Sequence, residues 1–177
     1  NGKLQKFDYI VSNPPFKLDF SDYRDELENS DQFFAGIPNI PPKKKDSMAI
    51  YLLFLQHIIH ILDDRGKAAI VVPTGFLTAQ SSIDKKIRQK LVDEKMLSGV
   101  ITMPSNIFAT TGTNVSILFI DKGNDDDVIL INASDLGEQV KEGKNKKTIL
   151  STSDEQQIID SFTKKESLDD FSILVSF

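Results

Sequence analysis

The 177-residue sequence contains neither cysteine nor tryptophan. The lack of cysteine excludes a disulfide framework, a cysteine-ligated zinc or iron–sulfur site, and a cysteine nucleophile. No stretch reaches the roughly 18 apolar residues that a membrane-spanning helix needs, and the amino terminus shows no secretory signal pattern. These absences predict a cytoplasmic protein with no membrane partner. Methionine is also missing from the first position, so we expect the chain to be a fragment.

The chain also has fewer basic residues than acidic residues. The chain has 21 basic and 26 acidic residues and a net charge of −5, which is not the composition of a basic nucleic-acid-binding protein. The deficit is confined to residues 101–177, which carry 7 basic and 13 acidic side chains, a balance of −6. In that third, the lysine run Lys141, Lys144, Lys146 and Lys147 could contact phosphate, but we expect it to be a solvated loop or a partner contact.

Short apolar runs alternate with longer helical patterns along the first hundred residues. Residues 7–12, 67–72 and 99–103 are apolar runs that each stop at or near a proline, which predicts buried strands. Residues 47–62 predict a buried helix, and residues 81–93 predict a helix with a basic exposed side. This order is typical of βαβ units and a parallel sheet in an α/β fold of about one domain.

The last part of the chain departs from that alternation. Only about a dozen residues separate Met103 from the next apolar run, Ser116–Asp121, and they show no helical pattern. A parallel crossover normally needs a helix, so this strand is expected to return antiparallel. Val128–Asn132 predicts a fifth strand. A capping-box pattern at Ser153–Gln156 predicts the start of a helix, and Phe171–Phe177 reads as a further strand.

The region between the first strand and the first helix shows no convincing period. Residues 17–45 contain Gly36 and three prolines, Pro38, Pro41 and Pro42, and we expect them to be disordered or highly mobile. Asp46 or Ser47 is expected to cap the helix that follows. His57 and His60 lie one turn apart on that helix, but a metal site needs more ligands, so we expect structural histidines and no metal.

The most informative pattern is Asn13-Pro14-Pro15-Phe16 at the end of the first strand. Ligands of open α/β sheets bind outside the carboxyl ends of the strands. An amide oxygen from Asn13 and the carbonyl of Pro14 could both accept hydrogen bonds from the amino group of a base, which favours a more nucleophilic nitrogen. The two prolines fix the backbone, and Phe16 offers a flat face for a base pulled out of the helix.

Four segments of the chain, taken together, resemble one family. The sequence FDYIVSNPPF resembles the catalytic motif of amino-group S-adenosylmethionine-dependent methyltransferases. Two further segments are similar to adenine-N6 DNA methyltransferases, namely DSMAIYLLFLQHIIHILDDRGKAAIVVPTGFL and VITMPSNIFATTGTNVSILFIDK. The tail, GKNKKTILSTSDEQQIIDSF and then FSILVSF, resembles the modification subunit of type I restriction–modification systems. The resemblance covers nearly the whole chain.

The resemblance implies a fold and a division of the chain. Residues 1–133 would form the second half of a Rossmann-like class I methyltransferase sheet, with one antiparallel strand. Residues 134–177 would form a short carboxyl-terminal extension of one helix and one strand. The family's glycine-rich loop for S-adenosyl-L-methionine is missing, so most of the cofactor site would lie outside this chain, which alone would be inactive.

The resemblance also implies roles for individual residues. Asn13 and Pro14 would hold the adenine N6, with Asn13 also at the edge of the cofactor site. Pro15 would complete the motif, Phe16 would stack on the base, and Phe108 would complete the base pocket. The implied partners are DNA, a specificity subunit that chooses the DNA sequence, and a restriction subunit.

Two other functions fit the same motif. RNA and protein-glutamine N-methyltransferases act on the same kind of planar nitrogen, so Asn13–Phe16 does not exclude them. The tail after Asp121 distinguishes these functions from a type I modification subunit. The RNA and protein-glutamine methyltransferases are smaller and are expected to end near the last strands of the sheet. A non-catalytic scaffold could also retain the motif as a simple turn, and cofactor binding by the full-length protein would separate a scaffold from an enzyme.

Overall fold

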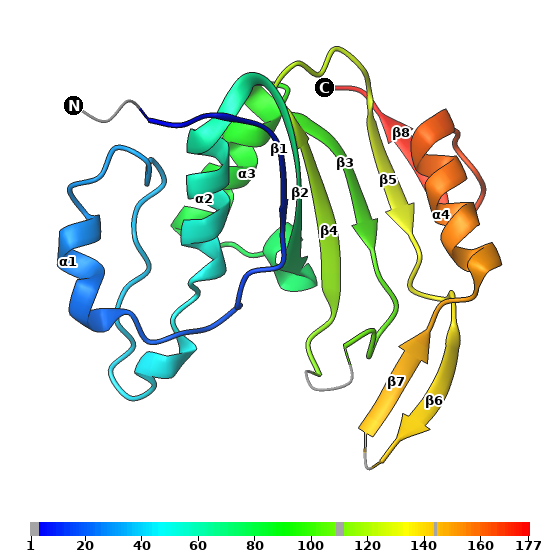
Figure 1. Ribbon diagram of the computed structural model, residues 1–177, viewed down its shortest axis with the longest axis horizontal. Helices are drawn as coiled ribbons and strands as arrows, with labels where there is room; N and C mark the ends of the chain where they lie inside the picture. Colours follow the sequence, from blue (N-terminus) through cyan, green and yellow to red (C-terminus); the bar gives the residue numbers. More distant parts are fainter. Residues whose placement is uncertain (1–3, 109–111, 144) are drawn as a thin grey trace.

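A six-stranded mixed sheet forms the centre of the computed structural model, which describes residues 4–108, 112–143 and 145–177 (Figure 1). The strand order is β1-β2-β4-β3-β5-β8. Strands β1, β2, β3 and β5 run parallel, whereas β4 and β8 run antiparallel to them. The expected antiparallel return is therefore confirmed. The strands are Phe7–Ser12 (β1), Leu62–Pro73 (β2), Leu97–Thr102 (β3), Val115–Asp121 (β4), Val128–Asn132 (β5) and Ser172–Val175 (β8).

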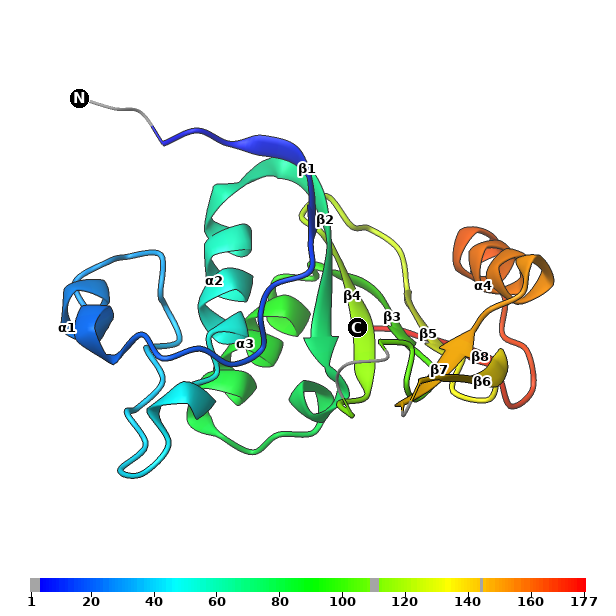
Figure 2. The same ribbon diagram turned by 60° about the horizontal axis from the view of Figure 1, so that its bottom comes forward.

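Helices pack on both faces of this sheet (Figure 2). Helices α2 and α3 cover one face, and α4 covers the other face near β3 and β5. A short helix, α1, lies in the segment that follows β1. The helices are Arg24–Leu27 (α1), Tyr51–Ile61 (α2), Ser82–Asp93 (α3) and Thr152–Lys164 (α4), with 3-10 turns at Ser21–Tyr23 (η1), Lys45–Ser47 (η2) and Thr74–Leu77 (η3).

Side chains alternate between two hydrophobic clusters because successive strand residues point to opposite faces. On β4, Leu118 packs in the cluster under α2 and α3, and Phe119 packs in the cluster under α4. The Phe119 ring lies 4.3 Å from the ring of Phe162 on α4. Gly99 on β3 leaves room for this helix to approach the sheet closely.

Two helix starts differ from the sequence expectation. Helix α2 begins at Tyr51 rather than Ser47, because residues 45–47 form a separate 3-10 turn and Met48 is extended. Neither Asp46 nor Ser47 caps it. The capping box of α4 is built on Ser151 and Asp154, two residues before the expected start, because the Ser151 side chain accepts from the Asp154 backbone.

The prediction of disorder for residues 17–45 is wrong. Phe20 and Ile37 from this segment are buried in a third hydrophobic cluster with Met48 and Leu53. The buried amide of Gln56 on α2 also accepts a hydrogen bond of 2.8 Å from the Ala35 backbone. The segment is ordered by these contacts with α2, which are distant in sequence and leave no periodic pattern.

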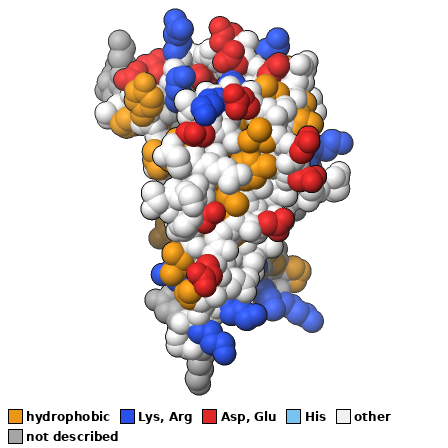
Figure 3. Space-filling view, turned by 90° about the vertical axis from the view of Figure 1, so that its right-hand side faces the viewer, with side chains coloured by type: hydrophobic (Ala, Val, Ile, Leu, Met, Phe, Trp, Pro, Cys, Tyr) orange, Lys and Arg blue, Asp and Glu red, His pale blue; other side chains and the backbone are white. Residues whose placement is uncertain are grey.

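A two-stranded hairpin, β6 (Glu138–Glu142) with β7 (Asn145–Ile149), lies outside the main sheet. It projects beyond the end of the sheet where the parallel strands finish (Figure 1). Lys and Arg side chains gather over this lower part of the molecule (Figure 3). Lys141, Lys146 and Lys147 therefore lie on paired strands rather than in a loop, and Lys144 lies outside the described residues. In the part of the chain that is described, no helix has both the length and the apolarity to cross a bilayer.

The close contact at Gly99 generates a stability prediction. A Cβ atom there would lie 2.8 Å from both Ile129 Cγ2 and Phe162 Cε2, whereas a Cβ at Gly75 would meet nothing within 4 Å. We expect Gly99→Ala to lower the free energy of unfolding by about 1–3 kcal/mol. The matched control Gly75→Ala should change it by less than about 0.5 kcal/mol. Urea denaturation compares the two, and equal stability of both variants would contradict this account of the packing.

Candidate active site

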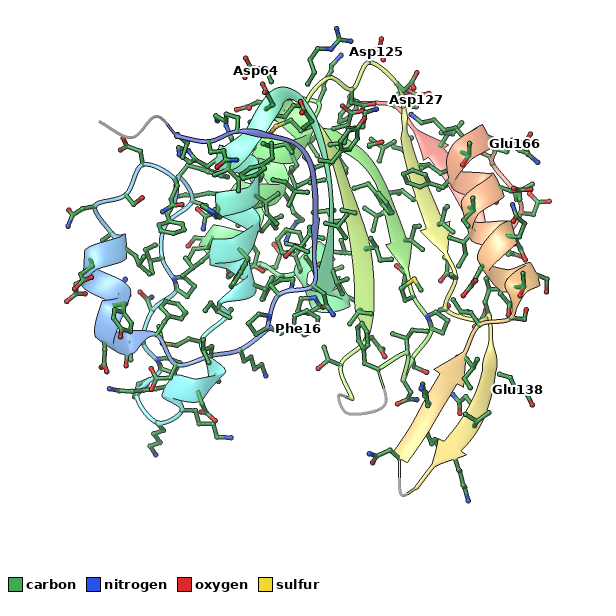
Figure 4. All side chains as sticks on the ribbon, viewed as in Figure 1. Phe16, Asp64, Asp125, Asp127, Glu138 and Glu166 are labelled. Carbon is green, nitrogen blue, oxygen red and sulfur yellow. The ribbon has the colours of Figure 1, made fainter. Side chains whose placement is uncertain are left out.

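The carboxyl ends of the parallel strands meet at one edge of the sheet, and the Asn13–Phe16 motif lies at this edge. The motif follows β1 directly, and the η3 turn follows β2 in the same way. The loop after β3 carries Phe108, and Ala133 follows β5. Phe16 is labelled at this lower edge, whereas Asp64, Asp125, Asp127 and Glu166 lie at the opposite edge (Figure 4).

The motif presents two hydrogen-bond acceptors. Pro14 is buried and holds the turn against the protein, while Asn13 and Pro15 are exposed. Among the described residues, neither the Asn13 side chain nor the Pro14 carbonyl oxygen takes part in a hydrogen bond. Both groups are therefore without a hydrogen-bond partner among the described residues, and the exposed Asn13 is open to a ligand at the end of β1.

The Phe16 ring is held by a chain of aromatic contacts. It meets Tyr51 of α2 edge-on, with ring centroids 6.3 Å apart and an interplanar angle of 78°. Tyr51 meets Phe76 of η3 in the same way, at 6.1 Å and 88°. The Arg88 guanidinium lies 5.7 Å from the Phe76 ring. Because Phe16 is only half-buried in this arrangement, part of its ring remains accessible at the edge of the sheet.

The hydroxyl of Tyr51 fixes this aromatic chain to α3. It donates a hydrogen bond of 3.0 Å to the buried carboxylate of Asp84. Asp84 also accepts a hydrogen bond from Ser81, the residue that caps α3. Burial, followed by the nearby charge of Asp84, raises the pKa of the Tyr51 hydroxyl well above its usual value. The tyrosine therefore stays protonated and keeps donating to Asp84 at any physiological pH.

The loop after β3 is held by two elements. The Met103 backbone donates to the Val115 carbonyl over 3.0 Å at the start of β4. From the hairpin, the Thr148 hydroxyl donates to the Ser105 carbonyl over 2.6 Å, and the Thr148 backbone donates to the Asn106 carbonyl over 3.0 Å. Phe108 is 37% exposed. The next residues, 109–111, lie outside the described part of the chain.

A cavity of about 600 Å³ lies elsewhere, between β3, β5 and the segment before β8. Its lining is largely apolar and includes Leu77, Val100 and Phe171, but none of the motif residues. It offers no convergent set of titratable groups of the kind that marks a catalytic centre. The Asn13–Phe16 turn is therefore the better candidate site, despite its open position at the edge of the sheet.

The described residues do not complete a nucleotide cofactor site. The segments after β1, β2, β3 and β5 contain a single glycine each at most, so none is a glycine-rich turn of the dinucleotide-binding kind. Within the same residues, no group of three or more histidine, aspartate or glutamate side chains is placed to hold a metal ion. His57 is exposed and pairs through Nδ1 with the Gln32 amide oxygen at 2.6 Å. Partial burial, followed by the nearby charge of His60, lowers the pKa of His57.

Sequence reasoning located the motif but missed the residues that support it. From the sequence, Tyr51 and Asp84 could be assigned only to two separate predicted helices. Their contact was not predictable, because it joins positions 33 residues apart. The support that Thr148 gives to the Phe108 loop was also missed, because it depends on a hairpin that the sequence did not reveal. The one sequence signal that could have pointed to Tyr51 was the presence of an aromatic residue near the start of the predicted buried helix.

Comparison with known proteins gives a consistent result. The whole chain, residues 1–177, matches the family model described as N-6 DNA Methylase. It is 33% identical, over 94% of its length, to the methylase subunit of the type I restriction enzyme MpnII from Mycoplasma pneumoniae. The chain covers 29% of that relative, so it corresponds to less than a third of its length.

Solved structures agree on the fold. The type I restriction–modification methyltransferase subunit of Streptococcus thermophilus superposes with a TM-score of 0.76 at 27% identity, covering 99% of this chain and 35% of that subunit. A Listeria monocytogenes protein assigned to the class I S-adenosylmethionine-dependent methyltransferases superposes with a TM-score of 0.54 at 18% identity, covering 92% and 43%. The mixed α/β sheet is therefore that of this methyltransferase class, as the sequence predicted.

The hydrogen bond between Tyr51 and Asp84 generates a second stability prediction. We expect Tyr51→Phe to lower the free energy of unfolding by roughly 1–3 kcal/mol, because the buried carboxylate loses a donor. The matched control Tyr23→Phe changes a tyrosine that is 65% exposed and should have little effect. Denaturation curves of both variants measure the difference.

The raised pKa of Tyr51 adds a pH signature to the same comparison. Above about pH 10 the unfolded chain releases the phenolic proton while the folded chain keeps it, so folding loses stability as the pH rises. The advantage of the unsubstituted protein over Tyr51→Phe should therefore shrink above about pH 10. A constant difference from pH 8 to about pH 11 would contradict the assigned environment.

Proposed function

The chain belongs to the N-6 DNA methylase family, and from this premise we propose that it forms part of an enzyme that methylates the N6 amino group of adenine in DNA. The proposal is supported chiefly by the position of Asn13 and Pro14, which offer two unpaired acceptors at the carboxyl end of β1. The Mycoplasma pneumoniae and Streptococcus thermophilus relatives belong to type I restriction–modification systems, and we assign this chain to the same kind of system.

The proposed chemistry acts on the lone pair of the amino nitrogen. In adenine this lone pair is delocalised into the ring, so the amino group is a weak nucleophile. The Asn13 amide oxygen and the Pro14 carbonyl oxygen each accept one amino hydrogen, which localises the lone pair toward the incoming methyl group. The nitrogen would then gain the methyl group as the methyl–sulfur bond of a sulfonium donor breaks and its electron pair stays on sulfur. The nitrogen would release one proton to solvent, and no general base is needed before attack.

Aromatic residues would hold the base while this occurs. Adenine must leave the double helix to reach Asn13, and a flipped base is commonly held by stacking on an aromatic side chain. Phe16 has an accessible ring whose orientation is set by Tyr51. Phe108 would close the pocket from the loop after β3, and Pro15 would keep the turn in shape.

The complete reaction needs more than the described residues supply. We propose S-adenosyl-L-methionine as the methyl donor, with Asn13 at the edge of its site. The relatives are much longer than this chain, and the remainder of the cofactor site would come from sequence outside the match. In this proposal residues 1–133 are the second half of the catalytic domain, residues 134–177 are an extension, and the enzyme acts in the cytoplasm.

The proposed partners follow from the type I assignment. A specificity subunit would choose the DNA sequence, and a restriction subunit would join the same complex. The experiments below therefore use the complete methylase polypeptide assembled with its specificity subunit.

Replacement of Asn13 tests the proposed chemistry. We expect Asn13→Ala to reduce methyl transfer to DNA by at least 100-fold, because one of two converging acceptors is lost. Asn39→Ala removes an exposed amide elsewhere and serves as the control. Radiolabelled methyl transfer followed by nucleoside analysis measures the rate and identifies the base. Near-normal N6-methyladenine formation by Asn13→Ala, or label found only in RNA or in protein glutamine, would refute the proposal.

Replacement of Phe16 tests the stacking role separately. We expect Phe16→Ala to lower kcat/KM about 10- to 100-fold, in line with the energy of stacking one base on an aromatic ring. Phe16→Tyr keeps the ring and should retain most of the activity. The role would be disproved if the alanine and tyrosine variants lost activity equally while both remained folded.

A further inference from the structure

The β6–β7 hairpin is a local concentration of positive charge in an acidic region. Residues 101–177 contain seven basic residues in all, and four of them lie between positions 141 and 147. Lys141 and Lys146 are exposed, and the gathering of Lys and Arg side chains around the hairpin is visible in Figure 3. The function proposed above gives this charge no role.

Two of these lysines face each other directly. Lys141 and Lys146 are cross-strand partners in the antiparallel register of β6 and β7. Side chains at such positions start roughly 5 Å apart, and like charges placed there destabilise a hairpin. Neither lysine forms an ion pair in the described part of the chain. An anion bound between them would relieve this repulsion.

The lysine pair is on the face of the hairpin that contacts the loop after β3. Side chains alternate along a strand, so Lys146 and Thr148 of β7 share one face. Thr148 on that face binds the backbone of Ser105 and Asn106, two or three residues before Phe108. Lys146 is two residues farther out, or about 7 Å along the strand.

Three acidic residues of the described part of the chain line the other face of the hairpin. A hollow there is lined by Asp135, Glu138 and Asp154 at the base of the hairpin. Because Glu138 and Val140 alternate with Gln139 and Lys141, they point away from the lysine pair. Asp125 and Asp127 lie at the opposite edge of the sheet (Figure 4). The positive face is thus separated from the acidic residues that dominate the net charge.

We propose that the face of the hairpin carrying Lys141 and Lys146 binds the phosphate backbone of DNA, next to the base that enters the site. This inference rests on the proposed function, since it places the hairpin beside a flipped base. Successive phosphates of one strand are separated by about 3.4 Å of helix rise. The distance of about 7 Å from Thr148 to Lys146 is therefore on the scale of the spacing between neighbouring phosphates. The hairpin would position the DNA backbone while its Thr148 contact holds the Phe108 loop.

Salt dependence of DNA binding tests this proposal. The complete methylase polypeptide, assembled with its specificity subunit, is titrated against a fluorescent duplex of arbitrary sequence at several salt concentrations. Each lost phosphate contact should reduce the slope of log K against log salt by about 0.9. Lys141→Gln with Lys146→Gln should therefore weaken binding and reduce the slope by up to about 1.8. Because phosphate contacts carry no sequence information, a duplex of different sequence should lose affinity by a similar factor.

Two control variants make the result specific. Lys141→Arg with Lys146→Arg keeps the charge and should keep the slope. Lys95→Gln with Lys164→Gln removes the same charge far from the site, because α3 and α4 both end at the opposite edge of the sheet. This control should behave like the unsubstituted protein. A purely structural role for the lysines predicts a lower melting temperature for the glutamine variant, whereas relief of like-charge repulsion predicts an equal or higher one.

The outcomes separate this inference from the proposed function. An unchanged slope in the hairpin variant would overturn the inference. The inference would also be overturned if the variant assembled poorly with the specificity subunit but the complexes that did form kept the original slope. Adenine methylation by the unsubstituted protein is measured independently. If that methylation occurs while the hairpin variant keeps its slope, only the hairpin proposal fails. If methylation is absent while the slope shifts as expected, the proposed function fails and backbone binding stands.

Discussion

The parallel pairing of β1, β2, β3 and β5 is the constraint on which the rest of the structure depends. It brings four carboxyl ends to one edge, so segments that are distant in sequence meet there. The Asn13 turn, η3, the Phe108 loop and the start of the hairpin connection all follow from this arrangement. Strand β4 lies between β2 and β3 and runs antiparallel to both. Strands β2 and β3 therefore keep the same direction.

The accessible motif depends on a buried scaffold. Helix α2 packs against the sheet and α3 on one side and against the Phe20 cluster on the other, which explains why its sequence is apolar almost all round. This double packing fixes Tyr51, and Tyr51 in turn limits the positions of Phe16. The turn proposed to present two acceptors and one ring to a substrate thus gains its geometry from buried residues behind it.

Sequence patterns within a few neighbouring residues predicted the strands and the motif, because these features depend on neighbouring residues. Apolar runs ended by proline marked the strands, connection length marked the antiparallel β4, and the motif was visible as four adjacent residues. The packing of residues 17–45 was not predictable in this way, because it depends on contacts such as that of Ala35 with Gln56. The hairpin was missed because its strands are polar and rich in lysine and glutamate, residues that are depleted in strands. Tertiary contact through Thr148 compensates for that weak local preference.

Net charge is a poor guide to DNA binding in this protein because charge is segregated by position. Asp125, Asp127 and Glu166 lie at the amino-terminal edge of the sheet, and Glu138 lies on the outer face of the hairpin. The lysine pair is on the opposite side of that hairpin, the side that contacts the loop after β3. An overall excess of acid is therefore compatible with a phosphate contact at the one edge where the chemistry is proposed. The parallel strands gather the segments of the proposed site at one edge of the sheet, and Asp125 and Asp127 lie at the other edge.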